Sequence, residues 1–117
     1  MPKNYVKPSM QEVFQIIDAA VKTDPEVTKG KEGVYQFNIK DEDEGTYQLI
    51  IDENGPRAVE GAEQDPQVTL TLKADNFRDL VAGNLNPTAA FMGGKLKIKG
   101  NMGLALKLQT VLNSFEF

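Results

Sequence analysis

The ten residues Phe91-Met92-Gly93-Gly94-Lys95-Leu96-Lys97-Ile98-Lys99-Gly100 contain the change of pattern that decides the fold. Two bulky apolar residues are followed by a glycine pair, which is typical of a helix end and a tight turn. Leu96 and Ile98 then alternate with three lysines, and this alternation predicts a strand with one apolar face and one charged face. A helix followed directly by a half-buried strand indicates an α+β domain.

Helical patterns lie on both sides of this stretch. Downstream, Asn101 is expected to cap a helix that has one broad apolar sector. The residues of this sector are Leu104, Ala105, Leu108, Val111, Leu112 and Phe115. Met102 and Leu106 fall outside the sector, where they line a cavity, cover its mouth or stay exposed. Upstream, Asp75 is expected to cap one short helix, and Pro87 to occupy the first turn of another.

The first part of the chain alternates apolar and polar residues in four segments, which predicts four further strands. These segments are 35–40, 47–51, 57–61 and 68–73. Short links between them predict antiparallel neighbours. The longer helical link from Leu72 to Leu96 is expected to form a crossover. Ser9 and Glu12 form a capping box that begins an amphipathic helix before the first strand.

The expected fold class is therefore α+β, with a five-stranded, mostly antiparallel sheet that contains one crossover. Because every strand alternates, one sheet face should be covered by helices and the other exposed to solvent. The chain has 117 residues, which suits a single domain over residues 1–117 with one core.

Composition excludes several function classes. The chain has no cysteine and no histidine, which removes disulfides, thiolate metal sites and histidine-based catalysis. Its net charge of −4 disfavours binding to nucleic acid. No apolar run approaches the ~20 residues that a membrane span needs, and neither a signal segment nor a Ser-Lys-Leu terminus is present. We therefore expect a cytoplasmic protein without metal or cofactor that contacts membranes only transiently.

Three charged or glycine-rich motifs each have an ordinary structural interpretation. The acidic run 41–44 lacks the glycine and glutamate positions of a calcium loop, so a solvated hairpin turn is favoured. Residues 93–95 lack the frame of a phosphate-binding loop, so a helix end and a tight turn are favoured. The lysines within 95–99 either protect an exposed sheet edge or contact a lipid headgroup or an anionic membrane, and edge protection is preferred.

The order of motifs in residues 72–112 resembles the type-two sterol carrier protein family. The resemblance is carried by Asp75-Asn76-Phe77 with Leu80, then Gly83-Asn84-Leu85-Asn86-Pro87, then residues 90–100 and a leucine-rich helix. The first helix and the early hairpins also match the family layout, so the resemblance covers nearly the whole chain. The absent peroxisomal terminus points to a stand-alone, prokaryotic-like member.

The resemblance implies helices over one sheet face and an apolar tunnel between the two. It also implies non-enzymatic binding of fatty acids, fatty acyl-CoA, sterols or other lipids, with lipid transfer as a further role. Because domains of this family are often fused to enzymes, a partner enzyme is also expected. In the family, the first helix is attracted to anionic membranes. The first helix of this chain is not basic on its polar face, so the chain departs from the family in this respect.

We expect the lipid to bind in the apolar space between the sheet and the helices. The short helices between residues 75 and 92 cover the sheet face incompletely, and the last helix has more apolar surface than one line of contacts needs. The candidate lining residues are Phe14, Ile17, Phe77, Phe91, Met92, Leu104, Leu108 and Leu112. The alternative is a fully packed core made of the same residues.

Two other function classes stay open. An interaction module would use the apolar groove to bind a partner protein or a second copy of the chain. A small isomerase would use an aspartate or a tyrosine in an apolar cavity, although Tyr35 and Tyr47 lie in strand patterns as core residues. A carboxyl group that titrates above about pH 6 inside the cavity would favour the enzyme.

Overall fold

A computed structural model describes residues 8–113 of the chain, apart from the side chains of Glu42 and Asn113. The described helices are α1 (Met10–Thr23), α2 (Ala74–Val81), α3 (Pro87–Met92) and α4 (Met102–Asn113), with the 3₁₀ turns η1 (Pro25–Thr28) and η2 (Asp41–Asp43). The described strands are β1 (Gly33–Lys40), β2 (Gly45–Ile51), β3 (Arg57–Glu60), β4 (Val68–Lys73) and β5 (Leu96–Gly100). All five strands lie where the alternation of the sequence predicts them.

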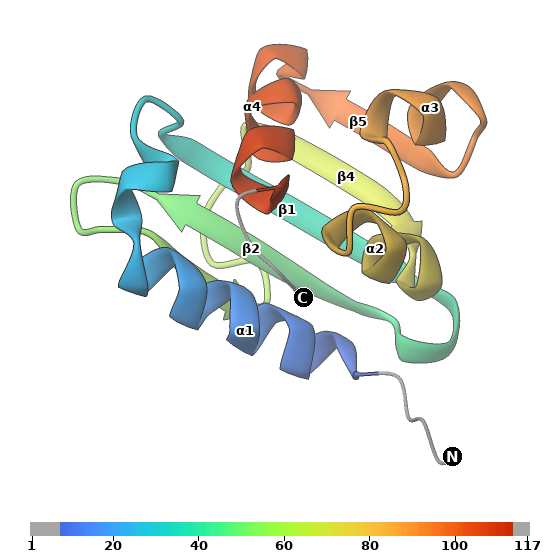
Figure 1. The fold of residues 1–117 in the computed structure, drawn as a ribbon, viewed down its shortest axis with the longest axis horizontal. Coiled ribbons are helices and arrows are strands. Elements are labelled where there is room, and N and C mark those ends of the chain that lie inside the picture. The colour runs from blue at the N-terminus through green and yellow to red at the C-terminus, as the bar shows by residue number, and fades with distance from the viewer. Residues whose placement is uncertain (1–7, 114–117) are drawn as a thin grey trace.

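The strands form one mixed sheet in the order β3-β2-β1-β4-β5 (Figure 1). The central pair β1–β4 is parallel, and the other neighbours are antiparallel. This confirms a mostly antiparallel sheet with one crossover, but the expected position of the crossover is wrong. The link from Leu72 to Leu96 joins an antiparallel pair, whereas β3 and β4 are not neighbours. The chain therefore crosses the sheet through residues 61–67.

Such a short link crosses the sheet because an extended chain advances about 3.3 Å per residue. The path from β3 to β4 covers three strand spacings, or roughly 15 Å, which residues 61–67 can span. Link length therefore does not distinguish a hairpin from a crossover at this position.

The crossing link is held by the side chain of Gln48 on β2. Its Nε2 donates to the Gln64 carbonyl oxygen at 2.7 Å and to Gln36 Oε1 at 2.9 Å. Its Oε1 accepts from the backbone N–H groups of Glu63 and Gln64, each at 3.1 Å. Gln48 is 0% exposed, and these bonds use both donors and both lone pairs of its amide. The buried polar group is thus fully satisfied.

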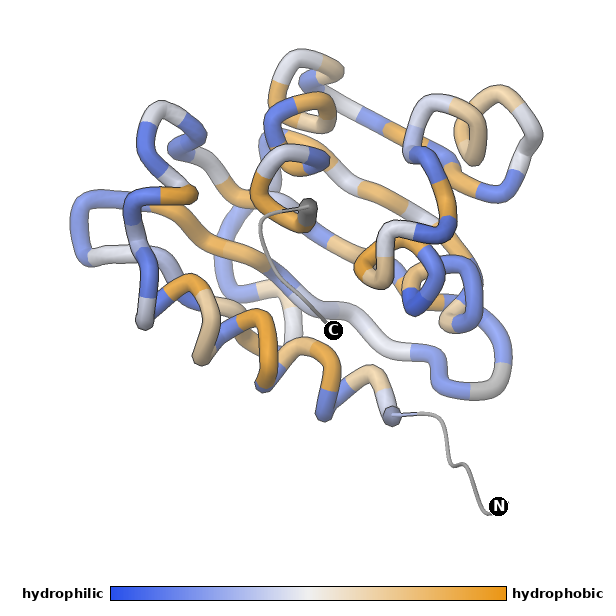
Figure 2. Tube along the Cα trace, in the orientation of Figure 1, coloured by the Kyte–Doolittle hydropathy of each residue, from blue (hydrophilic) through white to orange (hydrophobic). Residues whose placement is uncertain are grey.

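The helices cover the opposite face of the sheet. α1 lies along β2 and β3, while α4 contacts β1, β4 and β5 and lies beside α2 (Figure 1). Apolar segments of the helices and strands meet between these layers (Figure 2). The face that the sequence assigns to solvent is partly covered as well, because Gln48 and Ile50 on it are buried. That part of the expectation is wrong, because the crossing link binds to Gln48 on this face and no local sequence pattern predicts that link.

Helix ends follow the side chains expected from the sequence, with one exception. Ser9 and Glu12 form the predicted capping box of α1. The Asn101 side chain accepts a backbone hydrogen bond in the first turn of α4. The exception is α2, whose N-cap is Lys73, so that Asp75 lies inside the first turn instead. A carboxylate in the first turn is stabilised by the positive end of the helix dipole. Aspartate therefore suits the first turn as well as the N-cap position.

Within residues 8–113, no helix is both long enough and apolar enough to cross a bilayer. Phe115, which the sequence places on the apolar face of the last helix, lies outside the described residues. The expected domain extent, residues 1–117, also reaches beyond them and stays a prediction.

Replacing Gln48 with leucine should lower the free energy of unfolding by about 2–4 kcal/mol, because its partners lose their hydrogen bonds inside the structure. Urea denaturation measures this loss. Gln15→Leu on the exposed face of α1 is the matched control, and we expect it to change the same quantity by less than about 0.5 kcal/mol. Equal stability of the two variants would show that the crossing link does not depend on Gln48.

Candidate ligand-binding site

Aromatic rings from both sides meet between α1 and the sheet. The Phe14 ring is nearly parallel to the Tyr47 ring, with centroids 4.3 Å apart, and to the Phe77 ring, at 5.0 Å. The Phe37 ring is tilted against Phe14 and Phe77, at 5.3 Å from each. All four side chains are buried. Each such pair contributes about 0.5–1.5 kcal/mol beyond the burial of its area, so this cluster ties α1 and α2 to the sheet.

Six of the eight predicted lining residues belong to one buried apolar cluster. They are Phe14 and Ile17 of α1, Phe77 of α2, and Leu104, Leu108 and Leu112 of α4. Their exposed fractions lie between 0% and 9%. The structure therefore brings together, on one sheet face, the apolar residues of three helices that are distant in sequence.

The other two predicted lining residues lie outside this cluster. Phe91 is 42% exposed and Met92 is 81% exposed, whereas their neighbour Ala90 is buried. Successive residues of a helix point about 100° apart. Because α3 turns Ala90 toward the sheet, the two larger side chains that follow it point elsewhere.

Two apolar residues of α4 are exposed in the same way. Met102 is 45% exposed and Leu106 is 60% exposed, which agrees with their position outside the apolar sector of the sequence. Together with Phe91 and Met92 of α3, these two residues of α4 expose large apolar side chains to solvent. Single exposed apolar residues are common in folded proteins, so exposure alone does not define a site.

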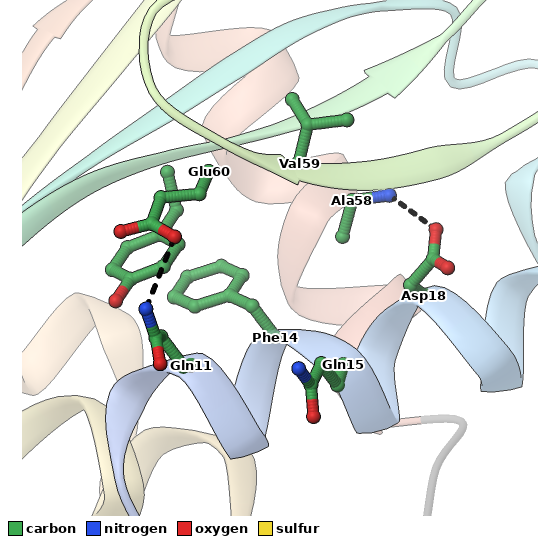
Figure 3. A pocket seen from close by; sticks show the side chains of 8 residues that line it. Gln11, Phe14, Gln15, Asp18, Ala58, Val59 and Glu60 are labelled. Carbon is green, nitrogen blue, oxygen red and sulfur yellow. Dashed lines mark hydrogen bonds between the residues drawn. The ribbon is translucent and has the colours of Figure 1, made fainter.

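A groove of about 300 Å³ lies between α1 and β3 (Figure 3). Its lining residues are Gln11, Phe14, Gln15, Asp18, Tyr47, Ala58, Val59 and Glu60. Gln11 Nε2 donates to Glu60 Oε1 at 3.2 Å, and the Ala58 N–H donates to Asp18 Oδ1 at 2.9 Å. These bonds join the helix to the strand across the groove. This feature has no clear signal in the sequence, because β3 is short and weakly patterned.

Two carboxylates line this groove, and one of them, that of Asp18, is paired with Lys22 at 2.9 Å. Asp18 and Glu60 are among its lining residues. Burial raises the pKa of Tyr47, and the carboxylates of Glu60 and Asp43 raise it further. A negatively charged headgroup would therefore be repelled here.

A second cavity, of about 460 Å³, lies where β4 ends and β5 begins. It is lined by lysines from β1, β4 and β5 and from the turn before β5. The sequence singles out only the lysines of residues 95–99. Those of β1 and β4 join them because of the parallel pairing, which the sequence does not reveal.

Two ionisable groups with shifted pKa values, one in the core and one near the surface, are poorly suited to proton transfer at neutral pH. Burial, with the Glu32 carboxylate second, raises the pKa of Tyr35 to about 12. The hydrogen bond from Arg57 is the main cause that lowers the pKa of Asp52. Neither group therefore exchanges a proton readily near pH 7. Within the described part of the chain, no three carboxylates are grouped so that they could hold a metal ion.

A mixed five-stranded sheet with helices over one apolar face is the architecture of the sterol carrier proteins. The sequence model of the SCP-2 sterol transfer family matches residues 13–113, and the chain belongs to this family. It is 39% identical over 109 residues to hydroxysteroid dehydrogenase-like protein 2 of Bos taurus, a match that covers 92% of the chain and 26% of the relative. The chain thus spans about a quarter of the length of the curated relatives it matches.

Solved structures confirm the fold class and the family resemblance. Sterol carrier protein domain 2 of Helicoverpa armigera is 32% identical with a TM-score of 0.75, over 87% of this chain and 84% of that one. Palmitated SCP2L2 of Aedes aegypti is 27% identical with a TM-score of 0.71, over 94% of this chain and 99% of that one.

Phe14→Ala should lower the free energy of unfolding by about 3–5 kcal/mol, because it removes the ring that contacts three others in the core. Phe91→Ala is the same substitution at a half-exposed position, and we expect a loss below about 1 kcal/mol. Thermal or chemical denaturation compares the two. A loss at Phe91 as large as at Phe14 would show that Phe91 is part of the packed core.

Proposed function

We propose that this chain binds the hydrocarbon chain of a fatty acid or related lipid between its sheet and its helices, and performs no chemistry on it. The observation that carries the proposal is the palmitated Aedes aegypti relative, which shares the fold over nearly its whole length. Fatty acyl-CoA and sterol-like molecules are further candidate ligands, and lipid transfer is the proposed role. The cytoplasmic location expected from the sequence belongs to the same proposal.

The proposed lining is the set of candidate residues on α1, α2 and α4. Their side chains are hydrophobic members of a single cluster, which suits a flexible hydrocarbon chain. We keep Phe91 and Met92 in the proposal as contacts for the part of the ligand that stays near the surface, since both are exposed on α3. Met92 also has the unbranched, adaptable side chain that tolerates ligands of different shape.

The energetics limit the expected affinity. Burying a ~16-carbon chain contributes roughly 12 kcal/mol, at ~0.8 kcal/mol per methylene. Immobilising the ligand costs ~4–15 kcal/mol, so a dissociation constant near micromolar or weaker is expected. Because the proposed lining is hydrophobic, it selects the chain rather than the headgroup.

Titration of the protein with a fluorescent fatty acid tests the proposal directly. We expect saturable binding with one ligand per protein, and displacement by unlabelled palmitate. Circular dichroism of the same sample shows whether the protein is folded. Absence of saturable binding by folded protein at tens of micromolar ligand would refute the proposed function.

Leu108→Trp tests the placement of the ligand, because the chain has no tryptophan of its own and Leu108 is 1% exposed. If the ligand occupies this space, the larger ring should be tolerated and should abolish fatty-acid binding. In a fully packed core it should instead lower stability by roughly 1–3 kcal/mol. Leu106→Trp is the control on the exposed side of α4 and should change neither property. A stable Leu108→Trp protein that still binds fatty acid would contradict the placement.

A second candidate function is an interaction module. It is favoured by the relatives, in which the matching segment is about a quarter of a longer dehydrogenase-like protein. In this case an apolar groove between the sheet and the helices, and not the groove between α1 and β3, would bind a partner enzyme or a second copy of the chain. Native mass spectrometry of protein purified from cells separates the two candidates. Co-purified lipid supports lipid binding, and a stoichiometric protein partner supports the interaction module.

A further inference from the structure

The second cavity gathers lysines from distant parts of the sequence. Parallel pairing of β1 with β4 places Lys40 beside Lys73, and antiparallel pairing of β4 with β5 places Lys97 beside Thr71. Lys95 lies in the turn that leads into β5. We call Lys40, Lys73, Lys95 and Lys97 the lysine corner; all four line the cavity of about 460 Å³. Figure 1 shows the end of β4, the start of β5 and the turn after α3 close together.

The lysine corner is positive in a chain whose net charge is −4. The other lining residues are Thr71, Leu72, Asn76, Gly93 and Gly94, and none of them is acidic. Among the described ion pairs, one involves the corner, between Lys73 and Asp41 at 3.5 Å. Like charges brought together in a sheet repel one another, so an anion placed among these ammonium groups would relieve that repulsion.

Protection of a sheet edge does not explain this arrangement. β5 is an edge strand, so Lys97 could serve that purpose. Lys40 and Lys73, however, are the last residues of β1 and β4, two of the three strands that do not lie at an edge of the sheet. Edge protection therefore does not account for their convergence with Lys95 on one cavity.

The backbone of the glycine turn shapes the cavity but supplies no free donors. Gly94 has a φ of +81° and open space at its Cβ position, so the wall is formed by bare main chain. The N–H groups of Gly93, Gly94 and Lys95 all donate to carbonyl oxygens of α3. This differs from phosphate loops, in which backbone N–H groups hold the ligand. An anion here would bind to lysine ammonium groups and to the Asn76 amide.

We propose that the lysine corner binds a phosphate group that carries at least one full negative charge. This site is separate from the hydrocarbon-binding space and does not depend on the proposed lipid function. Two sources share this chemistry: a soluble phosphorylated compound and the phosphodiester headgroup of an anionic phospholipid. The groove between α1 and β3 serves as an internal reference, since its carboxylates disfavour the same ligand.

Inorganic pyrophosphate is the probe for the soluble source. In ¹H–¹⁵N NMR spectra of the full chain, it should saturably shift the amide signals of residues 93–97 and leave those of Asp18 and Ala58 unchanged. The affinity should fall as sodium chloride is added. Lys95→Gln/Lys97→Gln should weaken binding by about 25-fold, or about fivefold for each lysine. The control Lys29→Gln/Lys31→Gln removes the same charge from the turn before β1 and should change affinity less than twofold.

Vesicles test the membrane source. Vesicles that contain phosphatidylglycerol are compared with pure phosphatidylcholine vesicles in sedimentation assays with the same variants. Saturable binding of pyrophosphate supports the proposal with a soluble phosphorylated compound as the source, provided that Lys95→Gln/Lys97→Gln loses this binding. Binding to phosphatidylglycerol vesicles but not to phosphatidylcholine vesicles supports it with an anionic phospholipid as the source, under the same condition. The proposal is overturned if neither probe binds, or if the control pair weakens binding as much as the corner pair. Lys95→Arg/Lys97→Arg keeps the charge and should retain binding, which separates a loss of charge from a loss of structure.

Discussion

One buried amide determines how the two halves of the sheet are joined. Gln48 binds the main chain of Glu63 and Gln64, and this fixes the crossing link across the back of the sheet. β4 is thereby delivered beside β1 instead of β3. β5 pairs with β4, and α2 follows β4 directly in the chain. The helix-covered face is therefore complete only when β4 is in place. A polar side chain on the far face thus controls the geometry of the apolar face.

Most elements of the fold follow from local patterns, because alternation and capping act over a few residues. The strands, the capping box of Ser9 and the cap of Asn101 were predictable for this reason. The crossover was not, since its signal is a set of tertiary hydrogen bonds made by Gln48 at a position that reads as solvent-facing. The exposure of Phe91 was also hidden, because the six-residue helix α3 is too short to reveal its own rotational phase.

The structure separates three kinds of surface that a lipid with a polar end would meet. Hydrophobic side chains fill the space between the sheet and the helices. Carboxylates line the groove beside β3, and lysines line the cavity at the other edge of the sheet. A net charge of −4 conceals this distribution, because it is the small difference between 13 basic and 17 acidic residues. The lysines of β1 and β4 become neighbours only through the parallel register, so composition alone gives no sign of them.

The parallel pair at the centre of the sheet also constrains how the chain folds. Residues 8–60 contain α1 and the β1–β2–β3 meander, whose pairings close short loops. Residues 68–113 hold the remaining elements, and the two parts meet along β1 and β4, where Tyr35 pairs with Val68. Loop-closure entropy must be overcome before such contacts stabilise the chain. Folding of this domain therefore requires long-range pairing of β1 with β4, and it should be slower than the folding of a helical bundle of equal length.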